Sequence, residues 1–145
     1  MNATDAAKLI EAQLQEYGLD PSESRLEPFG VGRWAFSAGS AEVEILLEEG
    51  EDEGELILEA RAPLLVLSGD TTALFAHVLE LNAGLLGGAF SVCNGMLEVR
   101  SNRRTDGLDQ VEFHQLVMDV AALADHYDDE LSEKFGMARE ADQVE

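Results

Sequence analysis

The residues Asn94 and Gly95 place the strongest constraint on how this chain can fold. Both residue types tolerate positive φ angles, and in this order they favour a two-residue type I′ turn between two strands. Such a turn fixes one pairing of the flanking residues: Cys93 with Met96, Val92 with Leu97, Ser91 with Glu98, and Phe90 with Val99. The apolar pairs then share one face and the polar pair lies on the other, so the sequence predicts a half-buried hairpin.

Alternation of apolar and polar residues continues upstream, between residues 33 and 61. Turn residues and an acidic stretch interrupt it, which predicts three antiparallel strands near 33–37, 42–48 and 56–61 with one face in water. An apolar run at 64–67 follows Pro63. Because proline cannot donate a hydrogen bond to a neighbouring strand, we expect this run at a sheet edge or a bulge.

Apolar residues recur at helical spacing in three segments: 4–17, 71–83 and 109–135. The predicted N-caps are Thr4 and Asp109, which begin the first and last segments, and Asp70, which precedes the second; Gly136 follows the last segment as a predicted C-terminal stop. The elements therefore follow the order α-β-β-β-α-β-β-α. This order predicts an α+β fold with a single antiparallel sheet that carries helices, formed by one domain over residues 1–136, and a disordered polar tail over 137–145.

Charge excludes several classes of function. The 145 residues include 30 acidic and 9 basic side chains, a net charge of -21. Phosphate-backbone binding requires clustered bases, and only Arg100, Arg103 and Arg104 cluster, too few even with Trp34 for a single-strand channel. We expect no direct nucleic-acid binding. The single cysteine excludes a disulfide framework, and no segment has the pattern of a signal peptide or membrane span, so we expect a cytoplasmic protein with no membrane partner.

No set of residues predicts catalysis. His77, His114 and His126 lack metal-ligand spacing, so we expect no enzymatic activity, no cofactor and no metal among them. The acidic loop over 48–55 faintly resembles a calcium loop, but its twelfth position is alanine and its flanks are strands. A solvated loop is the favoured interpretation, and a divalent-metal-binding or metal-sensing function through this loop is the alternative.

The helix predicted at 71–83 has more apolar surface than one sheet contact requires. Leu74, Val78, Leu81 and Leu85 form one line, whereas Phe75, Leu79 and Leu86 form a second beside it. Hydrophobic helix faces support dimerisation, and strand edges can bind extended segments. The candidate residues for protein binding or dimerisation are Phe75, Leu79, Leu86, Trp34, Phe36, Leu65 and Leu67.

Several local motifs together resemble the YbjN family, whose fold resembles that of type III secretion chaperones. They are the stretch LELN at 79–82, the stretch GGAFSV at 87–92, the turn at Asn94 and Gly95, the stretch TDGLD at 105–109 and the stretch LAD at 123–125. The resemblance covers about residues 70–135. It implies a homodimer that binds other proteins and contains no active-site motif.

We therefore expect a non-enzymatic, dimeric protein-binding module, either a chaperone-like protein or a regulatory adaptor. Its expected partners are a second copy of itself and a client protein. A net charge of -21 would steer basic clients, including DNA-binding proteins, toward it. A role in secretion and a role in stress response or regulation both remain open at this point.

Overall fold

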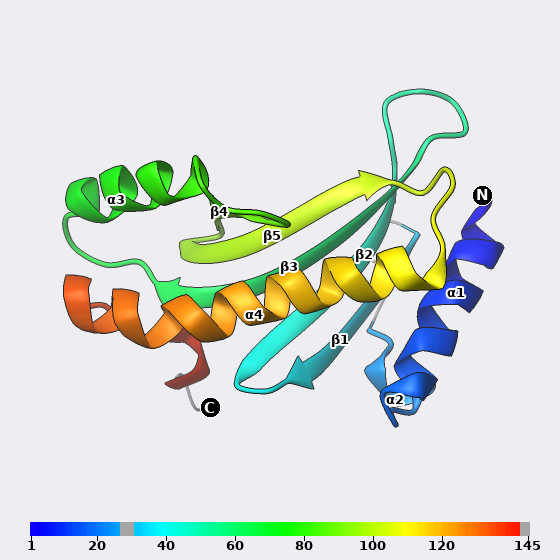
Figure 1. Ribbon diagram of the computed structural model, residues 1–145, viewed down its shortest axis with the longest axis horizontal. Helices are drawn as coiled ribbons and strands as arrows, with labels where there is room; N and C mark the ends of the chain where they lie inside the picture. The colour runs from blue at the N-terminus through cyan, green and yellow to red at the C-terminus, as the bar shows by residue number, and fades with distance from the viewer. Residues whose placement is uncertain (27–30, 143–145) are drawn as a thin grey trace.

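The computed structural model describes residues 1–26 and 31–142 and contains a five-stranded antiparallel sheet in the order β1-β2-β3-β5-β4 (Figure 1). The elements are α1 (Ala3–Glu16), α2 (Pro21–Ser24), β1 (Gly32–Ala38), β2 (Ala41–Glu49), β3 (Leu56–Val66), α3 (Thr72–Asn82), β4 (Ala89–Cys93), β5 (Met96–Arg104) and α4 (Gln110–Phe135), followed by a 3-10 turn at Glu140–Asp142. This arrangement confirms the predicted α+β fold and its single antiparallel sheet.

The β4–β5 hairpin has the predicted register, from the pair Cys93–Met96 to the pair Phe90–Val99. Asn94 has a φ angle of 51° and Gly95 one of 75°, as the type I′ turn requires. The local turn chemistry was therefore sufficient to predict this part of the sheet.

The region around Pro63 differs from the prediction in one respect. β3 continues through Pro63 to Val66 and lies in the middle of the strand order, so the strand as a whole is not the expected edge; its pairing with β2 nevertheless ends at Arg61, so beyond Pro63 it has β5 on one side and residues 138–139 on the other. The expected bulge is present, because the pairing of β3 with β5 shifts register between Pro63 and Leu65. A bulge allows a central strand to contain a residue that cannot donate to its neighbour.

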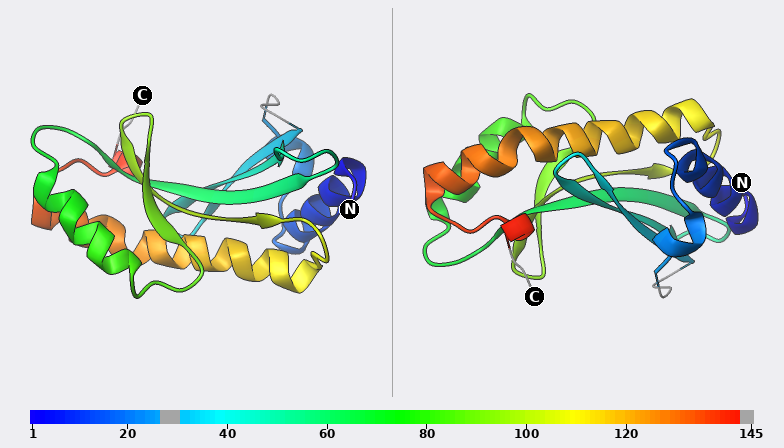
Figure 2. Two further views of the ribbon diagram at one scale, coloured as in Figure 1. Left: turned by 90° about the horizontal axis from the view of Figure 1, so that it is seen from above. Right: turned by 90° about the horizontal axis from the view of Figure 1, so that it is seen from below.

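α4 covers one face of the sheet along nearly its whole length (Figure 2). Asp109 caps its start, accepting a hydrogen bond from the backbone N–H of Glu112 at 2.8 Å, and Gly136 ends it in the left-handed conformation. The side chains that face the sheet are completely buried and are Phe113, Val117, Val120 and Leu131. Burial of each such side chain stabilises the fold by about 1.5–3 kcal/mol.

α1 packs beside α4 and buries Ala6, Ile10 and Leu14, which recur at helical spacing within the predicted segment 4–17. It begins one residue earlier than predicted, because the side chain of Asn2, and not Thr4, accepts a hydrogen bond from the backbone of Asp5. The short α2 was not predicted. Pro21 ends the α1 pattern and also starts a new helical turn, since proline is favoured at a first helical position.

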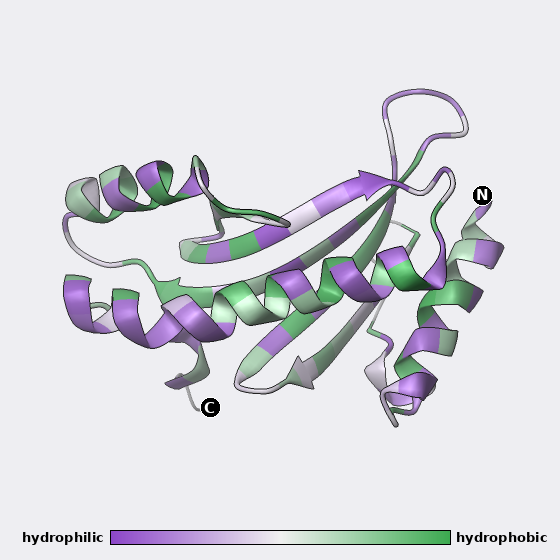
Figure 3. Cartoon of the chain, in the orientation of Figure 1, coloured by the Kyte–Doolittle hydropathy of each residue, from purple (hydrophilic) through white to green (hydrophobic). Residues whose placement is uncertain are grey.

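The two faces of the sheet differ in character, as the alternating colours along the strands in Figure 3 show. Residues that face α1 and α4 are apolar and buried, whereas charged residues dominate the opposite face. Among the described helices, none has both the length and the apolar character that crossing a bilayer requires.

The chain after α4 is ordered where the structure describes it, although the sequence predicts a disordered tail from residue 137. We refer to residues 137–142 as the C-terminal strap. Met137 is only 5% exposed, and Val66 donates a backbone hydrogen bond to the carbonyl of Ala138 at 2.9 Å. The strap is held by a contact with a distant strand, which local sequence pattern cannot predict. Residues 143–145 of the predicted tail lie outside the described residues.

A pair of glycine substitutions tests the turn. Gly95→Ala places a side chain at a φ of 75° and is expected to lower the free energy of unfolding by about 1–2 kcal/mol. Gly84→Ala is the matched control, because its new Cβ would lie 3.9 Å from the nearest atom, an ordinary contact. Urea unfolding of both variants measures the difference, and equal stabilities would contradict the turn assignment.

Candidate functional site

α3, the loop that follows it and the edge strand β4 together present three of the five large apolar side chains that are exposed among the described residues. Leu79 is 67% exposed, Leu86 90% and Val92 52%, and Phe75 is half-buried. We call these four residues the α3 patch. On the opposite side of the helix Leu74 and Val78 are buried in the core, as their predicted line requires. Of the second predicted line, Leu79 faces solvent on α3 and Phe75 is half-buried, whereas Leu86 lies beyond the helix, which ends at Asn82, in the loop that leads to β4.

A shallow apolar groove of about 240 Å³ lies within this region, between α3 and β4. Its lining is Phe75, Val78, Leu79, Phe90, Ser91, Val92 and Leu97. Because a single serine supplies the only polar side chain, the groove is suited to apolar side chains of a partner and offers no means of binding a charged ligand.

Asn82, at the end of α3, fixes the position of the groove. Phe90 donates its backbone N–H to the Asn82 Oδ1 atom at 2.7 Å, and the Asn82 Nδ2 atom donates to the Phe90 carbonyl at 3.2 Å. The side-chain amide therefore occupies the place that the backbone of a further strand would take next to β4. Near its middle, α3 is held by the ring of His77 against Phe135 of α4, with centroids 5.5 Å apart.

Three of the predicted binding residues are buried, which corrects the expectation that they form a surface. Trp34 is 1% exposed and donates to Glu11 of α1, and Phe36 is 6% exposed beside Tyr17. Leu65 is completely buried next to the C-terminal strap.

The cause of this error is the position of α1 and of the strap, which cover strand residues that sequence alone places near a sheet edge. Leu67 is half-buried. The sequence analysis did not identify Val92 as a candidate binding residue. Its predicted pairing with Leu97 places it on the apolar face of the sheet, and the sequence does not indicate that α4 leaves this part of the face uncovered.

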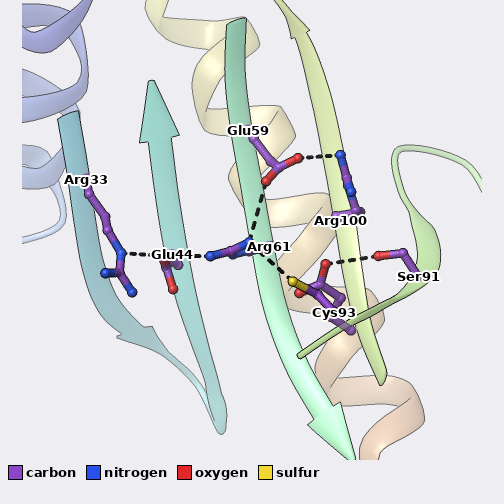
Figure 4. Close-up of polar contacts among 8 residues, drawn as sticks. Arg33, Glu44, Glu59, Arg61, Ser91, Cys93 and Arg100 are labelled. Carbon is purple, nitrogen blue, oxygen red and sulfur yellow. Dashed lines mark hydrogen bonds and ion pairs between the residues drawn. The ribbon is translucent and has the colours of Figure 1, made fainter. Parts of the chain in front are cut away.

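The opposite face of the sheet carries a ladder of alternating charges across four strands (Figure 4). Glu44 lies between Arg33, whose Nε is 2.5 Å from its Oε1, and Arg61, whose Nη2 is 3.1 Å from the same oxygen. Glu59 lies 3.9 Å from Arg61 and 2.6 Å from Arg100. Arg61 of β3 and Arg100 of β5 are direct cross-strand neighbours, and Glu59 pairs with both of them. The carboxylate therefore offsets the repulsion between the two positive charges.

Two carboxyl groups of this face have shifted pKa values in opposite directions. Burial would raise the pKa of Glu44, but the hydrogen bonds and charges of Arg33 and Arg61 outweigh it and lower the pKa. Burial raises the pKa of Glu98, and the hydrogen bond from Ser91 and the charges of Arg61 and Arg100 offset only part of this effect. The arginines therefore outweigh burial at Glu44, whose ionised form is favoured, but not at Glu98, where burial disfavours the ionised form.

Every arginine of the chain takes part in an ion pair with an acidic side chain. The cluster predicted from Arg100, Arg103 and Arg104 is divided among Glu59, Glu112 and Glu55. These arginines are consequently occupied, and Trp34, considered with them, is buried.

The histidines and the acidic loop do not converge on one site. His114 hydrogen-bonds to Tyr17 at 2.6 Å, whereas His126 packs against Tyr127 and His77 lies at α3. Glu55 of the acidic loop pairs with Arg104. Within residues 1–26 and 31–142, no three His, Cys, Asp or Glu side chains are grouped so that they could hold a metal ion.

Comparison with known proteins gives one family and one fold. Residues 6–133 match the model of the YbjN family, described as "Putative bacterial sensory transduction regulator". No curated protein matches the chain. A chain in the crystal structure of the ExsC–ExsE complex has the same fold, with a TM-score of 0.62 and 15% identity over 89% of this chain and 95% of that one. This likeness confirms the predicted type III secretion chaperone-like fold.

A second solved structure is similar but superposes less well. It is the heterodimeric ExoU–SpcU complex from the type III secretion system of Pseudomonas aeruginosa, with a TM-score of 0.49 and 18% identity. The similarity covers 81% of this chain and 93% of that one.

The contributions of Glu44 and Glu98 to the free energy of unfolding should depend on pH in opposite directions. A lowered pKa means that Glu44 stabilises the fold when ionised, so Glu44→Gln should cost about 1–2 kcal/mol at about pH 7 and less as the pH falls. A raised pKa means that ionised Glu98 destabilises the fold, so Glu98→Gln should stabilise it near neutrality and cease to do so in acid.

Urea unfolding at about pH 7 and about pH 4 measures both effects. Changes of the same sign in the two variants at neutral pH would show that the ladder does not have the electrostatics described.

Proposed function

Because this chain belongs to the YbjN family, we propose that it is a non-enzymatic regulatory protein that forms a homodimer and binds a client protein. Its α3 patch joins the two copies, and the client binds elsewhere. A solved structure with the same fold comes from a complex of two proteins, ExsC and ExsE. The proposal is supported most directly by the exposure of the α3 patch.

The exposed area of this patch is the observation that carries the proposal. Leu86 and Leu79 keep 90% and 67% of their surface in water, and Val92 lies beside them on an edge strand. Burial of one such side chain is worth about 1.5–3 kcal/mol, so a partner that covers several of them gains enough to form a stable interface.

The charge of the segment favours a second copy of the chain as this partner. Charged residues make up 27% of the sequence, yet Glu80 is the only Asp, Glu, Lys or Arg between Thr71 and Leu97. In a two-fold symmetric interface the same surface meets itself, so like charges would face one another. An uncharged surface avoids this repulsion, which matters in a chain with a net charge of -21.

The client is expected to differ in character from the dimer partner. Arginines of this chain already pair with its own carboxylates, and many acidic side chains remain outside those pairs. A strongly negative surface attracts basic proteins and raises their rate of association. We therefore propose a basic client, for which the protein acts as a chaperone-like or regulatory adaptor.

Charged substitutions in the patch test the dimer. Leu79→Asp combined with Leu86→Asp places four carboxylates in the proposed interface, and we expect the dimer dissociation constant to rise at least about 100-fold. Sedimentation velocity at micromolar concentration measures this change. The circular dichroism spectrum should remain that of the wild type, because both side chains are exposed.

Val111→Asp is the matched control. Val111 is also an exposed apolar residue, at 76%, but it lies on the first turn of α4, away from the patch. This variant should remain a dimer. A wild-type protein that is monomeric at these concentrations, or a double variant that dimerises as well as the wild type, would refute the proposed interface.

A further inference from the structure

The C-terminal strap lies in the position of an additional short strand of the sheet. After Gly136 the chain reverses and runs along the end of β3, where Leu65 pairs with Arg139 as an isolated antiparallel bridge. Val66 donates its N–H to the carbonyl of Ala138 at 2.9 Å. Figure 2 shows this last segment returning from the end of α4 to the side of the sheet.

The strap can pair with β3 because the pairing of β2 with β3 ends before β3 does. The pairing of β2 with β3 ends at Glu44 and Arg61, whereas β5 stays paired on the other side of β3 up to Val66. The backbone of β3 at Leu65 and Val66 therefore has a free side, which we call the β3 slot. Such an unpaired strand edge is a template for an extended segment, and here the strap fills it.

Two side chains hold the strap in the slot. Met137 is 5% exposed in the core, and its carbonyl accepts a hydrogen bond from Ser132 Oγ at 2.6 Å. Arg139 pairs with Asp129 of α4, and with Asp142 at 2.8 Å. Residues two apart in an extended segment point the same way. The strap thus binds through the apolar side chain of Met137 and, two residues later, through the basic side chain of Arg139.

The region around the slot contains more acidic side chains than the two that Arg139 pairs with. A pocket of about 240 Å³ at the strap has three acidic residues in its lining, Glu42 of β2, Asp128 of α4 and the strap's own Glu140. Burial and the neighbouring acid Asp129 raise the pKa of Asp128, and burial and Glu42 raise that of Glu140. Figure 3 shows the C-terminal half of α4, which borders this region, as mostly hydrophilic. Additional positive charge would therefore be stabilised here.

We propose that the β3 slot is a docking site for an extended basic segment of a partner protein, which displaces residues 137–139 of the strap. An apolar side chain of the partner takes the place of Met137, and an arginine or lysine two residues later takes the place of Arg139. The proposal rests on the proposed function in one respect only, that the ligand is a protein. It does not depend on the α3 patch.

A fluorescent synthetic peptide with the sequence of residues 136–142, made basic by the changes Glu140→Lys and Asp142→Lys, tests the slot against the full-length chain. In the wild type the tethered strap competes at a high effective concentration, so the peptide should bind weakly. Arg139→Glu repels the strap from Asp129 without altering the slot, and peptide affinity by fluorescence anisotropy should rise at least about tenfold. A peptide with glutamate at the position of Arg139 should not bind.

Two further variants keep the test decisive. Arg104→Glu also reverses the charge of an exposed, ion-paired arginine, but near the acidic loop, and it should leave peptide affinity at the wild-type value. Asp142→Ala removes one of the two ion pairs of Arg139, the one within the strap, and leaves the pair with Asp129. It should therefore raise the affinity for the peptide less than Arg139→Glu does. This milder variant decides the outcome if Arg139→Glu does not fold.

A folded strap variant that binds the peptide no better than the wild type would overturn the proposal. Sedimentation of the same samples separates this outcome from a failure of the proposed dimer. A monomeric protein whose strap variants bind the peptide would contradict the dimer alone, and a dimer whose strap variants do not bind it would contradict the slot alone.

Discussion

α4 packs along one face of the sheet, and most other features of the molecule depend on this contact. Phe113, Val117 and Val120 bury that face, so the apolar residues of the strands must point toward it. The opposite face is then left to charged side chains, which pair with one another in the ladder. Both proposed interaction surfaces lie near the C-terminal end of the helix, where α3 packs against Phe135 and the strap begins at Met137.

Charge separates the proposed surfaces by the type of partner each can accept. The α3 patch lies in the one long segment that is almost free of charge, so a second, equally negative copy can approach it without repulsion. The β3 slot lies among carboxylates and is filled by a segment with an arginine, so it favours a basic partner. Under the two proposals, a single chain would bind a copy of itself through the α3 patch and a different protein through the β3 slot.

Sequence pattern predicted the elements whose causes are local. The Asn94 turn fixed the register of its hairpin, and two apolar lines on one helix indicated the exposure of Leu79. Features that depend on distant contacts were missed. Leu65 looks like an edge residue until the strap covers it, and Met137 looks like part of a polar tail until β3 offers it a partner. Burial of Trp34 likewise depends on where α1 packs, which periodicity does not specify.

Hydrogen–deuterium exchange measured over a range of protein concentrations tests the central claim most directly. If a second copy covers the α3 patch, peptides from α3 and β4 should exchange more slowly as concentration rises, while those from β1 and the ladder strands should not change. Exchange in α3 that is independent of concentration, together with protection elsewhere, would contradict the account and move the interface to another surface.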